Sequence, residues 1–288
     1  MPGRGWKRCF LPVAVLLLVL VFQPDRSGAE RERRCRALLI GQGYTASEGI
    51  PAMPGGPADA GDMASMLENM SATPYEASVR TDLTADEIRN AVRETFAEAE
   101  EEDVILFYYA GHGFEGTDAG NRGALTGTDG ETVPLKELYE AMKRTTGRKI
   151  LILDSCYAGS ILAYAAADAG EEGICILCAA GPNSKTTEAF RDGEDYGSFT
   201  RTLIRGSDPE TLPADRNGDG MISLAEAYYY TREHTWEIGN VPVVYPENGQ
   251  AILWGTGQAV SKQRIVERRY RGLIMTEVPG TNGWREDR

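Results

Sequence analysis

The stretch from Asp103 to Gly113, DVILFYYAGHG, decides the fold. Residues 103–110 are apolar on both faces, as in a central strand of a parallel sheet that helices cover on both sides. The run ends in a Gly-His-Gly turn, where glycines let the backbone bend sharply. The stretch from Lys149 to Gly159, KILILDSCYAG, has the same plan and carries a second apolar strand into a turn that contains a cysteine.

Outward from these two strands, apolar runs alternate with amphipathic segments. Thr84 to Glu87 has the spacing of a capping box that opens a helix. The alternation predicts an α/β fold, a three-layer sandwich around a mostly parallel central sheet. Further strands are expected at 36–41, 76–82, 174–179 and 251–254, and helices at 57–70, 84–101, 135–144 and 223–236.

Two polar, glycine-rich loops are expected at 114–133 and 181–196, and each follows a strand end. Ligands of parallel sheets gather at the carboxyl ends of the strands, so these loops are expected to form the walls of a site.

The composition fits one sizeable globular domain. The chain has 288 residues, of which 42% are hydrophobic and 25% charged, and its formal net charge is −13. Such a negative surface repels nucleic acid and anionic lipid and favours basic partners or cations. The composition therefore argues against nucleic-acid binding.

The first 29 residues form a separate segment. Arg4, Lys7 and Arg8 precede an unbroken apolar run at 10–22, and small residues follow at 27–29. The run is shorter than the ~20 residues that a membrane-spanning helix needs. This pattern predicts a cleaved export signal and a secreted or extracytoplasmic protein. The alternative is an uncleaved amino-terminal anchor. Contact with a membrane is expected only in that case.

Four cysteines remain outside this segment, since Cys9 lies within it. Cys175 and Cys178 lie on the expected strand 174–179. Residues three apart on a strand point to opposite faces, which is poor geometry for a disulfide bond or a shared metal. Buried, free cysteines are the better interpretation.

His112 and Cys156 both follow the carboxyl ends of central strands. If the two strands are neighbours, the two side chains emerge side by side. An imidazolium and a helix amino terminus both stabilise a thiolate, and a helix is expected just after Cys156. His112 would then protonate the departing amine and activate water, while the amides of Gly113 and Cys156 hold the oxyanion. Either residue alone would be better read as structural, but the pair favours catalysis.

The paired motifs YYAGHG (108–113) and DSCYAG (154–159) closely resemble those of the caspase, metacaspase and paracaspase peptidases. The similarity covers residues 36–254, including the 84–101 helix and the segment 197–200. It implies a caspase-like fold and a cysteine endopeptidase without an organic cofactor. It also implies activation by self-cleavage in a loop.

The resemblance extends to specificity through Asp154. In metacaspases the matching acid lines the pocket for arginine or lysine, which implies cleavage of polypeptides after basic residues. Strand alternation would place Asp154 and Cys156 on the same side. The alternative is an aspartate that caps a helix or bonds a turn. Self-cleavage would then follow Arg122, Lys185 or Arg191.

Residues 215–226, DRNGDGMISLAE, match a twelve-residue calcium loop. Gly220 would make the turn, and Ca²⁺ would act as a structural clamp rather than a catalytic ion. The same residues have a second explanation, because Ser223 and Glu226 also have capping-box spacing. Pro213 leaves little room for an entering helix. The expected ligands are Asp215, Asn217, Asp219, the Met221 carbonyl, Ser223 and Glu226.

The predicted organisation is a signal at 1–29, a peptidase domain at 30–257 and a tail at 258–288. His234 is expected to stabilise the end of its helix. Two alternatives stay open. One is a legumain- or clostripain-like peptidase or transpeptidase with the same His–Cys arrangement. The other is a calcium-dependent binding module with an idle site. The oligomeric state stays open as well.

Overall fold

A computed structural model of the chain describes residues 33–118, 121–168, 173–186, 190–191, 194–195, 199–235, 240–259, 267–270, 273–277 and 284–287. The chain divides into two units, 1–32 and 33–288, and all of the described residues belong to the second. The export signal expected at 1–29 therefore lies outside them.

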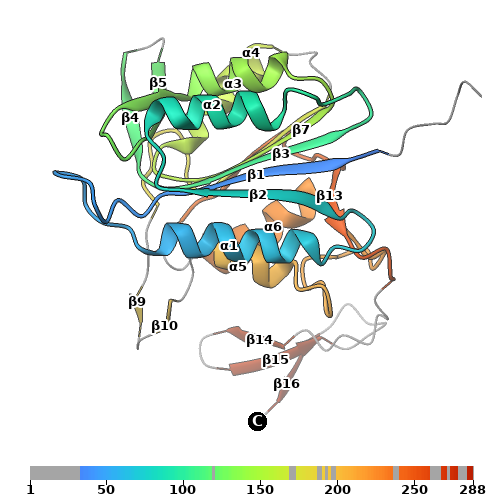
Figure 1. Cartoon of the computed structure of the whole chain (residues 1–288). Helices are drawn as coiled ribbons and strands as arrows, with labels where there is room; N and C mark the ends of the chain where they lie inside the picture. Colours follow the sequence, from blue (N-terminus) through green and yellow to red (C-terminus); the bar gives the residue numbers. More distant parts are fainter. Residues whose placement is uncertain are drawn as a thin grey trace, which may run out of the picture. The chain divides into compact units, whose positions relative to one another are not determined.

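The centre of the molecule is a six-stranded sheet in the order β12-β8-β7-β3-β1-β2 (Figure 1). Five of its strands are parallel, and β12 runs antiparallel to β8 at one edge. The predicted mostly parallel sheet is confirmed. The strands are β1 Cys35–Gly41, β2 Tyr75–Thr81, β3 Val104–Ala110, β7 Arg148–Asp154, β8 Ile174–Cys178 and β12 Val243–Tyr245.

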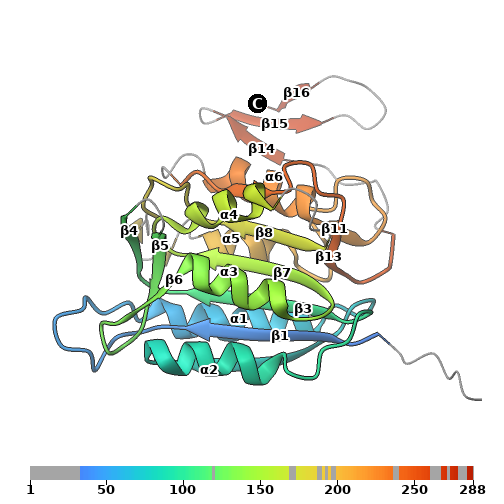
Figure 2. The ribbon, with the colours of Figure 1, turned by 90° about the horizontal axis from the view of Figure 1, so that it is seen from above.

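Helices cover both faces of this sheet, so the predicted three-layer sandwich is also confirmed (Figures 1 and 2). One layer holds α2 Ala85–Thr95, α3 Leu135–Arg144 and α4 Leu162–Ala167. The other holds α1 Gly55–Glu68, α5 Phe199–Gly206 and α6 Leu224–Thr235. Each face has its own apolar core. Cys175 belongs to one core and Cys178 to the other, and both are free thiols, as their spacing predicts.

Helix α2 begins as predicted but ends early. The Thr84 hydroxyl accepts the Glu87 amide and the Glu87 side chain accepts the Thr84 amide, so the capping box is formed. The helix ends at Thr95 instead of near residue 101. The sequence there is acidic, EAEEED at 98–103. Negative side chains near a helix carboxyl terminus oppose the helix dipole, which explains the early end.

The sequence predicts a loop at 114–133, but the structure has a small antiparallel sheet there. It holds β4 Gly113–Asp118, β5 Asn121–Thr126 and β6 Thr132–Pro134. Gly116 has a φ of 91° and Gly123 one of 75°, both in the left-handed region. These glycines and the short strands break the polar–apolar alternation by which a strand is recognised. In the second expected loop, residues 190–191 and 194–195 pair as β9 Phe190–Arg191 and β10 Glu194–Asp195.

Two more antiparallel sheets occur towards the carboxyl end. β11 Met221–Ser223 pairs with β13 Ile252–Gly255. In the predicted tail, β14 Glu267–Tyr270, β15 Leu273–Glu277 and β16 Trp284–Asp287 pair with one another, which the sequence did not reveal. A short 3-10 turn, η1 Ala158–Ile161, precedes α4. In the described part of the chain no helix is both long and apolar enough to span a membrane.

Candidate active site

The His112 turn and the Cys156 turn are in contact. Strands β3 and β7 are neighbours, with Ala110 opposite Asp154, and the Gly111 amide donates to the Asp154 carbonyl at 3.2 Å. A Cβ atom on Gly113 would lie 2.2 Å from the Cys156 carbonyl oxygen. Only glycine fits there, because a side chain would push the two turns apart. The strand order that places both residues at one sheet edge is therefore the one we had assumed.

The His112 imidazole is fixed by two segments that precede α1. Its Nε2 lies 2.8 Å from the Pro51 carbonyl oxygen. A carbonyl can only accept, so Nε2 carries the proton in this contact and Nδ1 is the nitrogen free to take one up. The Tyr44 ring packs against the imidazole with 4.7 Å between ring centroids. The ring is thus held both along its edge and across its face.

Tyr44 also holds the backbone of the histidine turn. Its hydroxyl accepts the His112 amide at 3.0 Å and donates to the Thr126 carbonyl at 2.9 Å. Tyr109 completes the network, since its hydroxyl donates to the His112 carbonyl and accepts the Thr126 amide. Burial raises the pKa of Tyr44 to about 12, so the hydroxyl stays neutral. No sequence pattern marks this role, because Tyr44 lies in a different segment from His112.

Cys156 follows β7 in a sharp turn. The strand ends at Asp154, and Tyr157 adopts a left-handed φ of 60°. Strand alternation therefore does not reach Cys156, and our argument that it shares a side with Asp154 was wrong. The expected helix is present as η1 followed by the six-residue α4. The half-exposed Cys156 Sγ lies 3.7 Å from the Thr186 hydroxyl.

Asp154 is bonded to the start of α5. One carboxylate oxygen accepts the Thr200 hydroxyl at 2.7 Å and the Thr200 amide at 3.2 Å. The Tyr108 hydroxyl lies 2.8 Å from the same Thr200 oxygen. A carboxylate that accepts an amide from a helix's first turn acts as a cap, so the alternative explanation of Asp154 has geometric support. A pocket role remains compatible with this, since each oxygen has two lone pairs.

A second acid, Asp59 of α1, lies near the same place, and sequence reasoning missed it. Burial and the negative charges of Asp154 and Asp59 together raise the pKa of Tyr108. The Asp59 side chain is only 13% exposed and lies 3.7 Å from the Arg201 guanidinium. Only the sheet topology reveals that α1 brings an acid to this strand end.

The loop at 215–226 folds around its own side chains. The two oxygens of Asp215 accept the amides of Gly218 and Gly220 at 2.6 Å and 2.8 Å. Gly220 has a left-handed φ of 80°, as the expected turn requires. Asp219 accepts the Met221 amide at 2.8 Å. The backbone thus has the curvature of a cation-binding loop.

Glu226 is less well prepared to bind a metal. One of its oxygens accepts the amides of Arg216 and Asn217, and the other accepts the amide and hydroxyl of Ser223. The Ser223 hydroxyl in turn accepts the Glu226 amide, which completes the capping box of α6. Each carboxylate oxygen has two lone pairs, and all are occupied. Glu226 could coordinate an ion only by giving up some of these bonds.

Within the described residues, which include this loop, no three His, Cys, Asp or Glu side chains are grouped so that they could hold a metal ion. Asp215, Asp219 and Glu226 therefore do not form such a group in this structure. His234 lies in the last turn of α6, and its Nδ1 is 2.8 Å from the Tyr230 carbonyl oxygen. Its imidazole also stacks on the Tyr230 ring. This contact agrees with a role at the helix end.

Comparison with known proteins gives a consistent result. Residues 34–222 match the model of a protein family described as the caspase domain. A search of curated protein sequences finds no match. Two solved structures share the fold. Caspase-1 from Spodoptera frugiperda has a TM-score of 0.56 at 11% identity over 80% of this chain and 92% of its own. A protein of Geobacter sulfurreducens has a TM-score of 0.51 at 16% identity over 79% of this chain and all of its own.

Proposed function

The chain belongs to the caspase-domain family of cysteine peptidases, and from this premise we propose that it is an endopeptidase with a His112–Cys156 dyad. The observation that supports the dyad best is the contact of the two turns, in which the Gly113 backbone packs on the Cys156 carbonyl. A fixed imidazole and a half-exposed thiol then share one sheet edge.

The proposed reaction is hydrolysis of a peptide bond through an acyl-enzyme. The Cys156 thiolate attacks the carbonyl carbon, and His112 gives its proton to the departing amine as the C–N bond breaks. The enzyme is left as a thioester. His112 then takes a proton from water, and the hydroxide attacks the thioester carbonyl as the C–S bond breaks. This step releases the carboxylic acid and the Cys156 thiolate, and it leaves His112 protonated as at the start.

The oxyanion of each tetrahedral intermediate would be held by the amides of Gly113 and Cys156. The register of β4 and β5 supports the Gly113 amide as a donor to the oxyanion. The Thr126 amide donates to the His112 carbonyl, so His112 is at a bonded position of the antiparallel pair. The next residue, Gly113, then turns its amide away from β5.

We further propose that the enzyme cleaves after arginine or lysine. Asp154 supports this, and the charge of Asp59, which lies 3.7 Å from the Arg201 guanidinium, also acts on Tyr108 at the same strand end. A guanidinium or ammonium group entering a pocket with these carboxylates would gain charge-assisted hydrogen bonds. An aspartate side chain would be repelled.

Hydrolysis of matched fluorogenic peptides ending in Arg, Lys, Asn or Asp tests both proposals. The wild-type protein should cleave the Arg and Lys peptides, and Cys156→Ala should cleave none. Asp154→Asn should lower kcat/KM on the Arg peptide by roughly 10- to 100-fold, the value of a lost charged hydrogen bond. Glu68→Gln, at the exposed last residue of α1, is the control.

Other outcomes of this assay point to the alternatives. A preference for Asn would indicate a legumain-like enzyme, and cuts after Asp would overturn the basic specificity. A protein that cleaves none of the peptides and whose Cys156 resists alkylation at neutral pH would be a binding module with an idle site.

Self-processing is proposed after Arg122, Lys185 or Arg191. Lys185 has the strongest support because it is exposed and lies between two residues that contact the cysteine turn. The Ser184 carbonyl accepts the Tyr157 amide at 2.8 Å, and Thr186 lies against Cys156 Sγ. Amino-terminal sequencing of incubated wild-type protein and of Lys185→Gln would identify the bond. A new amino terminus that follows none of the three basic residues would contradict the proposal.

Residues 1–29 are proposed to direct export and to be removed. Their basic start, apolar run and small residues at 27–29 support this. Expression of the full chain followed by mass spectrometry of the exported fraction should give a protein that begins at Glu30. A cell-associated protein that keeps Met1 would instead favour a membrane anchor.

We propose that the 215–226 loop binds Ca²⁺ weakly. Asp215, Asn217 and Asp219 offer the oxygen ligands that the ion prefers, and the turn at Gly220 supports the loop geometry. Glu226 must exchange capping bonds for metal bonds, which costs affinity. We therefore expect a Kd of roughly 10⁻⁴–10⁻³ M, the weak end of such sites.

Calorimetry with millimolar calcium chloride tests this site. The wild-type protein should give a saturating trace and Asp219→Ala a flat one, and calcium should raise the Tm of the wild type only. Asp208→Ala, outside the loop, is the control. Flat traces for every protein would show that the loop does not bind calcium. The capping box would then be the role of Ser223 and Glu226.

A further inference from the structure

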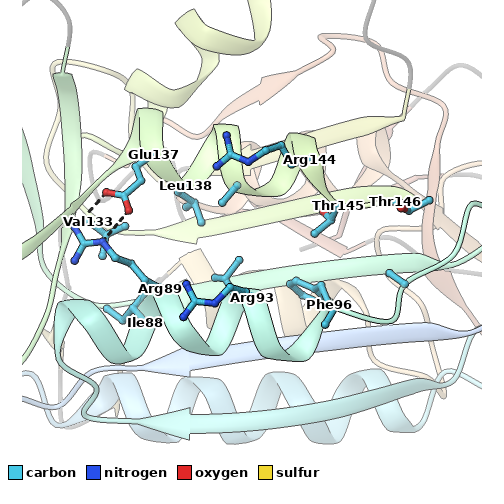
Figure 3. A pocket seen from close by; sticks show the side chains of 14 residues that line it. Ile88, Arg89, Arg93, Phe96, Val133, Glu137, Leu138, Arg144, Thr145 and Thr146 are labelled. Atoms are coloured by element: carbon cyan, nitrogen blue, oxygen red, sulfur yellow. Dashed lines mark hydrogen bonds and ion pairs between the residues drawn. The ribbon is translucent and has the colours of Figure 1, made fainter.

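A cavity of about 440 Å³ lies between α2 and α3 (Figure 3). Its volume falls in the ~300–1,000 Å³ range of small-molecule sites. None of its lining residues belongs to the proposed dyad or to the calcium loop. The lining residues come from α2, from α3 and from the segments beside these helices.

The inner part of the cavity is apolar. Ile88 and Val92 line it from α2, and Phe96 lines it directly after that helix. Leu138 and Ala141 line it from α3. All but Ala141 are buried in the core of this face, so the floor is rigid. A slot with such walls favours an alkyl or aryl group over a polar one.

The rim of the cavity is cationic. Arg93 and Arg144 are both exposed and rise from the two opposite helices (Figure 3). Among the described residues, Arg93 donates only to the neutral Asn90 side chain. Arg144 is 71% exposed, and its one ion pair, with Glu140, is at 4.0 Å. Both guanidinium groups can therefore turn towards a ligand.

The remaining charges of the lining cancel each other. Arg89 lies 2.8 Å from Glu137 and 3.0 Å from Asp86, and it also donates to the Thr132 carbonyl. Glu137 is the only acid of the lining and is neutralised by this pair. Among the lining residues Arg93 and Arg144 thus keep their positive charge, next to the acidic run at 98–103 that borders the lining residue Ala97. The apolar slot and this local charge together select an anionic amphiphile.

We propose that this cavity binds a medium-chain carboxylate. The alkyl tail enters the slot between α2 and α3, and the carboxylate lies at the mouth between Arg93 and Arg144. Guanidinium groups bind a carboxylate through paired N–H···O bonds, which accounts for two arginines around one head group. The inference does not depend on the peptidase reaction.

Titration calorimetry with decanoate, below its micelle concentration, tests the head group. The wild-type protein should bind one decanoate saturably. The double variant Arg93→Gln/Arg144→Gln should bind it at least tenfold more weakly, and Arg205→Gln, an exposed arginine of α5, should match the wild type. Decanol has the same tail without charge and should bind the wild type at least tenfold more weakly than decanoate does.

The slot is tested by filling it. Ala141→Phe places a ring into the cavity from a partly exposed helix position and should abolish decanoate binding while circular dichroism and Tm stay near those of the wild type. If Ala141→Phe fails to fold, the arginine variants still show whether decanoate binds at the mouth of the cavity. No saturable binding by the wild type, equal binding of decanoate and decanol, or unchanged binding by the double variant would overturn the proposal.

Discussion

His112 is held by residues that are distant in sequence. Pro51 accepts from its Nε2, the Tyr44 ring covers its face, and the Tyr44 hydroxyl holds its amide. Tyr44→Phe keeps the ring and removes only the hydroxyl. We expect kcat on an Arg peptide to fall by about tenfold with little change in KM, since a positioning residue acts on the reaction rather than on binding.

Nuclear magnetic resonance can separate positioning from a general loss of stability. The chain has only two histidines, so His112 and His234 give two assignable imidazole signals. Tyr44→Phe should shift the His112 ring nitrogens and leave those of His234 unchanged. Tyr75→Phe is the matched control, because it removes another buried hydroxyl, one that donates to the Leu253 carbonyl. An unmoved His112 signal in Tyr44→Phe would contradict the positioning role.

The four described cysteines differ sharply in environment. Burial raises the pKa of Cys35, of Cys178 and of Cys175, the last to about 11, so these thiols stay protonated. Cys156 is half-exposed. At pH 7 iodoacetamide should modify Cys156 in the native wild type, and peptide mapping can show the modified residue. The modification should be absent from Cys156→Ala and present in Cys178→Ala. Equal labelling of Cys175 or Cys178 would contradict this order.

At the scale of elements, the capping box of α2 should contribute measurably to stability. Thr84→Ala removes the hydroxyl that accepts the Glu87 amide and should lower the free energy of unfolding by about 1 kcal/mol. Urea denaturation at pH 7 measures the loss, and Thr81→Ala, at the exposed end of β2, should change little. Equal losses in both variants would argue against the cap.

The same box predicts a pH dependence. Hydrogen bonds from the Thr84 amide and hydroxyl lower the pKa of Glu87. A carboxylate with a lowered folded pKa stabilises the fold above its ordinary value, and this stability is lost as the pH falls through the folded pKa. The difference between wild type and Thr84→Ala should therefore shrink below about pH 4, which is near the ordinary value of a glutamate.

The elements that the sequence predicted well share one physical property. Strands such as β3 and β7 are buried on both faces, so all seven residues of β3 and residues 150–153 of β7 carry an apolar signal. The sheet of β4, β5 and β6 has no such signal. Its strands are short and interrupted by left-handed glycines, and it is held by backbone pairing, which composition does not record.

At the scale of the whole molecule, some residues of the candidate site could be predicted from the sequence and others could not. The approach of the His112 and Cys156 turns could be predicted because each turn directly follows a recognisable strand. Tyr44 and Asp59 could not, because nothing local marks them. Thr200 lies in the segment 197–200 that the resemblance covers, but its contact with Asp154 could not be predicted. They reach the site only through the order of strands β1, β3 and β7 and the packing of α1 and α5 on that sheet.

The buried thiols on both faces of the central sheet make the whole fold sensitive to alkali. A group with a raised folded pKa contributes stability that is complete below its unfolded pKa and is lost as the pH rises through the folded pKa. For Cys175 this window runs from about 9 to about 11. A shift of this size corresponds to roughly 2–3 kcal/mol of unfolding free energy.

Urea denaturation between pH 7 and pH 11 should therefore show a steady fall in the free energy of unfolding above about pH 9. Cys175→Ala starts lower at pH 7 because it leaves a small cavity, yet it should fall less steeply, since it has no thiol to keep protonated at that position. Thr81→Ala, an exposed substitution that removes no titratable group, is the control and should keep the wild-type slope. If Cys175→Ala and wild type lose stability in parallel up to pH 11, the alkaline sensitivity arises elsewhere, and the central sheet tolerates a buried thiolate.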